Sequence, residues 1–230
     1  MKPPGAPAVR PGLPRAVDIA AALAGLAVAT PVVALAAAAI VLTTGDPPFF
    51  RQRRIGRYGR PFTLVKLRTM RRSTSGAAVT SRGDARVTRV GAVLRRTKVD
   101  ELPQLWNVLR GEMAFVGPRP EVPRYVDPSH PLWVRVLAAR PGLTDPVTLR
   151  LRNEEELLEG APGDREAFYR AHLQPWKLRG YAAYLERRNW RTDARVLLET
   201  ALAVARPAKA RPPSIDDILA EGLQTCGDAR

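Results

Sequence analysis

The feature that most restricts how this chain can fold is a segment, residues 19–42, that contains no charged side chain. Ala, Leu, Val and Ile make up most of it. About 20 such residues are enough for a helix to cross the hydrocarbon core of a bilayer. A cleavable signal peptide fits less well, because the apolar stretch is long and no small-residue cleavage site stands before the basic residues that follow. The segment predicts a membrane helix near the N-terminus.

Two details of this segment leave its topology open. Pro31, preceded by Thr30, removes a backbone hydrogen bond and clashes with the preceding turn, so the helix should bend there. Arg10 and Arg15 stand before the segment, and four arginines follow within residues 51–57. Because Lys and Arg are favoured on the cytoplasmic side, a re-entrant helix that bends at Thr30-Pro31 and returns would satisfy both flanks. A kinked helix that crosses the membrane once is the alternative.

Positive charge is concentrated directly after the apolar segment. The chain carries 37 Lys and Arg against 22 Asp and Glu, and its net charge of +15 indicates an anionic partner. Between Arg51 and Lys98, fifteen basic residues stand against a single acidic one, Asp84. Basic and apolar residues alternate within residues 62–70, which predicts a strand or an irregular packed segment with cations on one face. A folded basic face suits phosphates, whereas a patch that attracts anionic membrane lipids is the simpler alternative.

Nucleic acid is the other anionic partner that such a charge could serve. The sequence contains no helix-turn-helix, zinc-knuckle or aromatic RNA-binding motif, and aromatic residues total only 6%. We therefore expect no nucleic-acid binding and keep a membrane-anchored nucleic-acid-binding protein as an alternative. Cys226 is the single cysteine and His130 and His172 are the two histidines, which argues against a disulfide framework or a zinc site. A metal here would take oxygen ligands.

Two adjacent acidic residues, Asp100 and Glu101, stand at the start of an amphipathic segment. Its apolar positions recur at helical spacing and predict one buried stripe: Leu102, Leu105, Trp106 and Leu109. Acidic residues at a helix start are often simple caps. Here Arg95 precedes the pair, and Arg119 follows the helix between two prolines that fix its direction. A carboxylate beside fixed arginines predicts a phosphoryl-transfer site in which the carboxylate acts as nucleophile.

Together these segments resemble the bacterial sugar transferases, the monotopic polyprenyl-phosphate phosphoglycosyl transferases that initiate polysaccharide and glycoconjugate assembly. The matching segments are PPFFRQRRIG (47–56), KLRTM (66–70), GDARVTRVG (83–91), DELPQLWNVL (100–109), GPRPE (117–121) and PGLT (141–144). With the apolar start they cover residues 18–204. In this order the motifs are highly specific for the family.

The resemblance implies a mainly helical fold with a few short strands. A small α+β catalytic domain would rest on the cytoplasmic face of the bacterial cell membrane, anchored by a re-entrant helix broken at Thr30-Pro31. We accordingly expect four parts: a flexible basic tail (1–16), the re-entrant membrane helix hairpin (17–44), the catalytic domain (45–205) and a flexible tail (206–230). Within the last part we expect a short helix near residues 215–219. The oligomeric state is not indicated.

The resemblance also implies a reaction. Asp100 would attack the β-phosphate of a UDP-sugar, release UMP and carry the phosphosugar until polyprenyl phosphate, usually undecaprenyl phosphate, accepts it. Mg²⁺ is expected at Asp100, and Glu101 is expected to assist proton transfer or to orient Asp100. The residues expected to bind phosphate or substrate are Arg95, Arg119, Lys66 and Arg152.

One segment departs from the family pattern, in which Pro-Gly-Ile-Thr is usually followed by Gly, an apolar residue, Ala, Gln, Val, Asn, Gly, Arg and Asn. This chain continues with DPVTLRLRN (145–153) and keeps only the final Arg152 and Asn153. The region is expected near the nucleotide-sugar, so the identity of the donor stays open. A catalytically degenerate membrane scaffold of the same family is therefore a further alternative. The acidic residues 154–156 that follow predict a solvated helix face.

Overall fold

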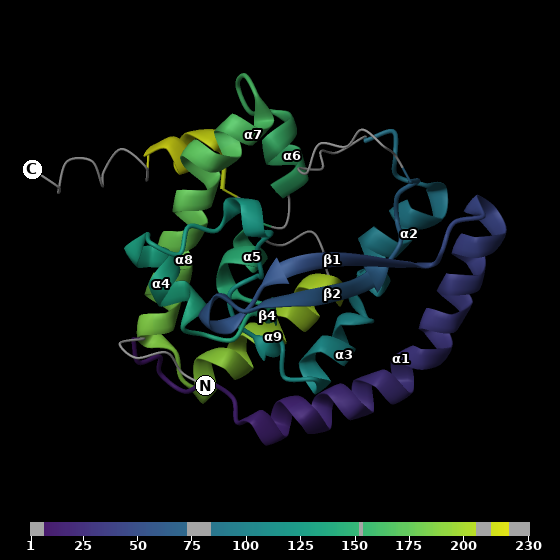
Figure 1. Ribbon diagram of the computed structural model, residues 1–230, viewed down its shortest axis with the longest axis horizontal. Helices are drawn as coiled ribbons and strands as arrows, with labels where there is room; N and C mark the ends of the chain where they lie inside the picture. Colours follow the sequence, from purple (N-terminus) through teal and green to yellow (C-terminus); the bar gives the residue numbers. More distant parts are fainter. Residues whose placement is uncertain (1–6, 73–83, 152–153, 206–212, 221–230) are drawn as a thin grey trace, which may run out of the picture.

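The computed structural model describes residues 7–72, 84–151, 154–205 and 213–220 (Figure 1). This part of the chain is mainly helical with a few short strands, as the sequence predicted. The helices are α1 (Arg15–Thr44), α2 (Arg89–Thr97), α3 (Gln104–Leu109), α4 (Pro131–Leu137), α5 (Pro146–Arg150), α6 (Glu154–Glu159), α7 (Arg165–Phe168), α8 (Gln174–Arg187) and α9 (Trp190–Ala205). The strands are β1 (Phe49–Ile55), β2 (Pro61–Leu67), β3 (Ala114–Val116) and β4 (Gly142–Thr144). Short turns are η1 (Arg57–Gly59), η2 (Val99–Glu101), η3 (Pro123–Tyr125) and η4 (Tyr169–Leu173).

Helix α1 contains the apolar segment and lies along the domain as one long, bent helix (Figure 1). Its most apolar stretch has a mean hydropathy of 2.4, yet only 11% of that stretch is buried. The buried side chains of α1 are Asp18, Ala22, Ala29, Ala36 and Ile40. Their spacing follows the helical repeat, so a narrow stripe faces the domain. The remaining aliphatic surface is exposed, which makes α1 a candidate membrane helix.

The chain stays helical through Thr30 and Pro31, although the proline has no N–H to donate. The Thr30 hydroxyl donates to the carbonyl oxygen of Leu26 at 2.6 Å. Helix α1 ends at Gly45, whose left-handed conformation (φ 71°) lets its N–H donate to the carbonyl oxygen of Val41. Thr30-Pro31 therefore lies within a continuous helix in this structure.

Both halves of α1 pack against the same domain. In the first half, Ala22 joins an apolar cluster with Val108, and the Arg15 guanidinium donates to the Val108 carbonyl oxygen at 2.5 Å. In the second half, Ile40 is 1% exposed and packs in a cluster with Leu67 of β2. The two ends of the apolar helix are thus both fixed to the folded domain.

The β1–β2 hairpin carries the first part of the basic segment. Its turn uses the left-handed conformation at Tyr58 (φ 59°) and at Gly59 (φ 74°). The antiparallel register places Phe50 opposite Lys66. Because Leu67 is fully buried in a cluster with side chains of α1, the strand that carries Lys66 is fixed to this helix.

The parallel pair β3–β4 fixes the GPRPE segment. Gly117 and Gly142 approach so closely that a Cβ atom on Gly142 would lie 2.2 Å from the Gly117 nitrogen. Only glycine fits at such a backbone contact. The segment that contains Arg119 is therefore held against residues 141–144.

The largest apolar core lies among α4, α5, α6, α7 and α8. Trp133, Phe168, Leu173 and Trp176 are among its buried side chains. Residues 215–220 form the short helix that the sequence predicted, and Ile218 is 1% exposed within this core. This part of the C-terminal segment is therefore packed against the domain.

A buried ion pair joins the segment before α1 to α8 and α9. Asp193 of α9 is fully buried and accepts from Arg188 at 2.9 Å, from the Tyr184 hydroxyl at 2.5 Å and from the Leu13 N–H at 3.0 Å. Arg188 also donates to the carbonyl oxygen of Val116 in β3 at 2.8 Å. Residue 13 is thereby held beside α8, α9 and β3, just before α1 begins.

This arrangement predicts a large stability cost for Asp193→Ala. The change would leave the Arg188 charge buried without its partner, so the free energy of unfolding should fall by about 3 kcal/mol. Glu199→Ala is the matched control, because Glu199 pairs with Arg195 on the exposed side of the same helix; it should cost less than about 1 kcal/mol. Thermal unfolding in detergent would measure both, and equal losses would contradict this account.

Candidate active site

Asp100 and Glu101 lie in η2, the turn that joins α2 to α3. Lys98 ends α2 in the left-handed conformation (φ 59°), which redirects the chain just before the acidic pair. The sequence placed the pair at the N-terminus of α3, but α3 begins only at Gln104. Pro103 has no N–H to donate, so regular helical hydrogen bonding starts after it. The pair is therefore positioned by a turn and not by a helix dipole.

Helix α3 differs from the prediction in a second respect, because Trp106 is 51% exposed. The buried side chains of α3 are Gln104, Leu105, Asn107 and Val108. Asn107 faces inward because its amide group donates to the Thr63 carbonyl oxygen at 2.8 Å and accepts from the Val65 N–H at 3.2 Å. These bonds attach α3 to the edge of β2. The apolar pattern assigned Trp106 to the buried face of this helix, whereas the structure exposes Trp106 and buries the polar side chain of Asn107.

Glu101 forms a two-pronged ion pair with Arg119. The guanidinium donates to the two carboxylate oxygens at 3.0 and 3.4 Å. Burial alone would raise the pKa of Glu101, but the charges of Arg119 and Lys98 outweigh burial and lower this pKa to about 2. Glu101 raises the pKa of Arg119 in turn. The Glu101 carboxylate is therefore ionised, and Arg119 donates a hydrogen bond to each of its two oxygens.

Asp100 has different surroundings. It is 4% exposed, and no residue in the described part of the chain hydrogen-bonds its Oδ1 atom. Burial and the charge of Glu101 raise the pKa of Asp100, against the attraction of nearby cations that include Lys66 and Arg95. A buried carboxylate beside cations, with one oxygen unbonded, can act as a nucleophile or as a ligand for a hard cation.

Lys66 faces the acidic turn from β2. Its Nζ atom lies 5.5 Å from the centre of the Phe50 ring, the residue opposite it in the hairpin. Burial lowers the pKa of Lys66, while the charge of Asp100 opposes that change. The predicted strand is therefore present as β2, and the charge of its single cation, Lys66, acts on Asp100.

Arg95 lies in the last turn of α2. Its Nε–H donates to the Thr69 hydroxyl at 3.0 Å, and its Nη1 donates to Glu155 at 2.9 Å. Glu154 pairs with the buried Lys177 at 3.0 Å. The predicted solvated helix face is therefore confirmed for Glu155 and Glu156, which are exposed. It is wrong for Glu154, which is partly buried because it pairs with Lys177.

Three residues that the sequence gave no role hold the GPRPE loop in place. Arg54 of β1 donates to the Pro120 carbonyl oxygen at 2.9 Å and to Glu121 at 3.3 Å, and the Tyr169 hydroxyl donates to the other oxygen of Glu121. Arg54 lies in the motif at residues 47–56 and Glu121 in the motif at residues 117–121, so the sequence did mark these two positions. Tyr169 lies 48 residues away in the sequence, where no local signal points to the site.

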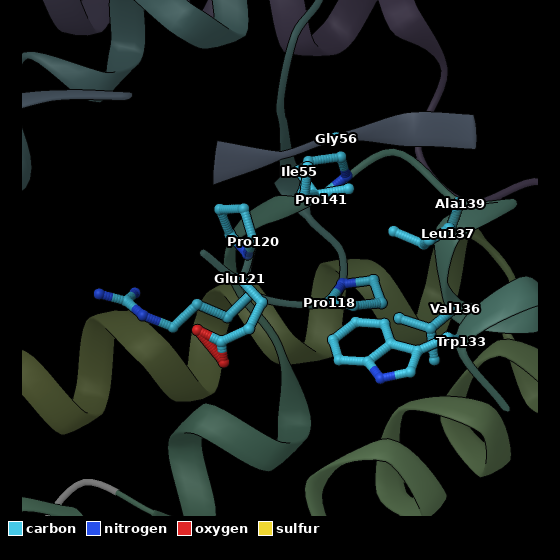
Figure 2. Close-up of a pocket in the computed structure, with 11 residues that line it drawn as sticks. Ile55, Gly56, Pro118, Pro120, Glu121, Trp133, Val136, Leu137, Ala139 and Pro141 are labelled. Carbon is cyan, nitrogen blue, oxygen red and sulfur yellow. The ribbon is translucent and has the colours of Figure 1, made fainter. Parts of the chain in front are cut away.

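A cleft lies beside this loop, between the end of β1 and α4 (Figure 2). Pro118, Trp133 and Pro141 form much of its wall. Among its lining residues, Arg119 and Glu121 alone are charged. Its wall is thus mostly apolar, and the charges of the candidate site gather around Asp100 instead.

The structure brings together Asp100, Glu101, Lys66, Arg95 and Arg119, but Arg152 lies outside the described residues. Among the residues that are described, no three His, Cys, Asp or Glu side chains gather as a preformed metal site. Mg²⁺ is often bound by one or two carboxylates plus substrate phosphates. The unbonded oxygen of Asp100 fits that kind of site.

These features define a cationic site around a buried carboxylate, in a domain packed against a long apolar helix. The bacterial sugar transferase family matches residues 10–207 of the chain. The chain therefore belongs to the bacterial sugar transferase family, as its motifs predicted.

Several curated relatives carry sugar-phosphate transferase names. The chain is 41% identical over 192 residues to the UDP-glucose:undecaprenyl-phosphate glucose-1-phosphate transferase of Caulobacter vibrioides. The matched region covers 81% of this chain and 67% of the Caulobacter protein. The chain is 38% identical over 135 residues to the UDP-N-acetylgalactosamine-undecaprenyl-phosphate N-acetylgalactosaminephosphotransferase of Aeromonas hydrophila (56% and 32%). It is 46% identical over 110 residues to the UDP-glucose:undecaprenyl-phosphate glucose-1-phosphate transferase of Escherichia coli (47% and 24%). The chain thus spans about two thirds of the Caulobacter protein and a third or less of the other two.

The contrast between the two carboxylates predicts stability changes of opposite sign. The pKa of Asp100 is raised by folding, so its charge opposes folding at neutral pH. Asp100→Asn should therefore raise the free energy of unfolding by about 1 kcal/mol at pH 7. The gain should shrink as the pH falls and vanish below 3.8, the ordinary pKa of this group, because the carboxyl is then protonated in both states.

Glu101→Gln is the control for this measurement. The pKa of Glu101 is lowered to about 2, so its charge contributes stability above the ordinary value of 4.5 that is lost as the pH falls. Glu101→Gln should destabilise the protein at pH 7. Thermal unfolding of both variants across pH would test the pair, and changes of the same sign would contradict it.

Proposed function

We propose that this protein transfers a sugar 1-phosphate from a UDP-sugar to polyprenyl phosphate and releases UMP, which initiates the assembly of a polysaccharide or glycoconjugate. The observation that carries the proposal is the buried Asp100 carboxylate, which has an unbonded oxygen and faces Lys66 and Arg95. The names of the relatives support undecaprenyl phosphate as the acceptor. The exposed apolar surface of α1 supports a location at the membrane, where a lipid substrate would be available to such a site.

The reaction proceeds in two displacements at phosphorus. In the first, a carboxylate oxygen of Asp100 attacks the β-phosphorus of the UDP-sugar, and the bond to the α-phosphate oxygen breaks to release UMP. The sugar phosphate is then held on Asp100 as an acyl phosphate. In the second, an oxygen of polyprenyl phosphate attacks the same phosphorus and frees the carboxylate. The charge that develops on the phosphoryl oxygens is stabilised by positioned cations.

The roles of the remaining residues follow from their contacts. Glu101 is occupied by Arg119 and stays ionised, so we assign it to orienting Arg119 and Asp100 rather than to proton transfer. Lys66 and Arg95 face Asp100 and would bind the diphosphate. Mg²⁺ bound at Asp100 would supply further positive charge for the phosphate oxygens.

The membrane topology is proposed to be re-entrant, with the catalytic domain on the cytoplasmic face. Both ends of α1 pack against one domain, through Arg15 and Ala22 at the start and through Ile40 at the end. A helix that crossed the bilayer once could not keep both contacts, because its ends would lie on opposite sides. The basic residues on both flanks agree with this topology.

Cysteine labelling would test the topology. Ala8→Cys and Arg51→Cys, each in a Cys226→Ser background, lie before and after α1 at exposed positions. The sample would be cells whose outer membrane is permeabilised and whose inner membrane is intact. Both cysteines should react with a membrane-permeant maleimide, and neither should react with an impermeant one. Reaction of one position alone with the impermeant reagent would overturn the re-entrant assignment.

Release of UMP from a panel of UDP-sugars, with undecaprenyl phosphate and Mg²⁺, would test the activity. At least one donor should be turned over, and Asp100→Asn should lower kcat by about 10³-fold or more. Arg119→Met should lower kcat/KM by about 10²-fold, because one fixed cation is removed. Turnover should fall in acid at a pH above 3.8, because the pKa of Asp100 is raised.

Two outcomes would reject this function. A folded, membrane-bound wild-type protein that releases no UMP from any donor would favour a non-catalytic scaffold of the same family. Equal turnover by the wild type and by Asp100→Asn would remove the assigned nucleophile. Glu199→Ala lies on an exposed face of α9 and should leave turnover unchanged. It is the control for losses of activity during purification of the variants.

A further inference from the structure

Tyr181 is a buried residue of α8 to which the steps above give no role. Its side chain is 3% exposed, and within the described residues its hydroxyl oxygen has no hydrogen-bond partner. Its neighbour Gly180 packs so tightly on α5 that an added Cβ atom would lie 2.6 Å from Val147. Tyr181 is therefore held firmly at the contact between α8 and α5, and it cannot easily turn to find a partner.

The polar groups nearest to Tyr181 are already engaged with other partners. Lys177, one helical turn earlier on α8, holds Glu154 at 3.0 and 3.3 Å. Asp145 is fully buried and caps α5, where it accepts from the Val147 N–H, the Thr148 N–H and the Thr148 hydroxyl at 2.7, 2.8 and 2.6 Å. Asp145 and Lys177 therefore have their own hydrogen-bond partners, and the Tyr181 hydroxyl has none among the described residues.

The location of this hydroxyl connects it to the candidate active site. Asp145 follows Thr144, whose carbonyl oxygen accepts from the Gly117 N–H at 3.0 Å, so the α5–α8 contact that holds Tyr181 adjoins the loop that carries Arg119. Tyr181 and Asp145 also interact electrostatically with Arg119, the partner of Glu101. Asp145 is also the first residue of the segment that departs from the family pattern. A buried hydroxyl without a partner destabilises the free protein, so its position beside the site suggests that a substrate group completes it.

We propose that the Tyr181 hydroxyl hydrogen-bonds a hydroxyl or acetamido group on the sugar of the donor, which makes Tyr181 a specificity-determining residue of the proposed reaction. The inference rests on the proposed function. A sugar group fits better than a phosphate, because the charges of Asp145, Glu154 and Glu121 act on this hydroxyl against that of Lys177, and Lys177 is already paired with Glu154. Neutral sugar hydroxyls can both donate to and accept from a phenol.

The free protein gives the first test, with Tyr181→Phe and Tyr184→Phe as a matched pair on one helix. Tyr184 donates to Asp193 and lies in the buried ion-pair network. Without substrate, Tyr181→Phe should keep or raise the melting temperature, whereas Tyr184→Phe should lower it by about 2 °C or more. A lower melting temperature for Tyr181→Phe would show that the hydroxyl has a structural partner, and this result would overturn the proposal.

Turnover gives the second test, using the donor that the UMP-release panel identifies. Tyr181→Phe should lower kcat/KM about tenfold, while inhibition by UDP, which lacks the sugar, should change less than twofold. Tyr184→Phe should leave both unchanged per folded molecule. Unchanged kcat/KM for Tyr181→Phe, or an equal loss of UDP affinity, would overturn the proposal.

The two proposals fail in different ways. If the wild type releases no UMP from any donor, the proposed function fails, and binding then decides the role of Tyr181. At least one UDP-sugar should still raise the wild-type melting temperature more than UDP does, and Tyr181→Phe should remove that difference. Equal protection by UDP and by all UDP-sugars in the wild type would overturn the assignment of Tyr181.

Discussion

The ion pair between Arg119 and Glu101 is the contact on which the rest of the site depends. Two adjacent carboxylates in a buried turn would repel each other and would both be driven toward the protonated form. Arg119 occupies both oxygens of Glu101, so Asp100 remains the carboxylate with an oxygen to spare. Arg119 can do this because its loop is fixed from both sides: Gly117 meets Gly142 at a contact that only glycine allows, and Arg54 bonds the loop at Pro120.

The same elements connect this ion pair to the long apolar helix α1. Lys66 and Leu67 are neighbours on β2; the charge of Lys66 acts on Asp100, while Leu67 packs in a cluster with Ile40 of α1. Val108 of α3 packs against Ala22 at the other end of α1, and the turn with the acidic pair lies directly before α3. Helix α1 therefore helps to position both Lys66 and the acidic pair.

The sequence predicted much of this, and the limits of the prediction have physical causes. The apolar helix, a strand in the basic segment, and the clustering of Lys66, Arg95 and Arg119 around the acidic pair followed from residue types and motif order. Trp106 was placed in the core because an apolar stripe was assumed, whereas Asn107 is buried with satisfied hydrogen bonds. Glu154 was assigned to solvent because its cationic partner, Lys177, lies 23 residues away in the chain. Long-range pairing of this kind leaves no local pattern.

The most direct test of the central claim is to trap the sugar phosphate on the enzyme. The protein would be incubated with a UDP-sugar labelled in the β-phosphate, without polyprenyl phosphate, then quenched, digested and analysed by mass spectrometry. The account predicts one labelled peptide, with the phosphosugar on Asp100 and lost on treatment with hydroxylamine, as expected for an acyl phosphate. Label on another side chain, or product formation with no labelled protein at any time point, would contradict it.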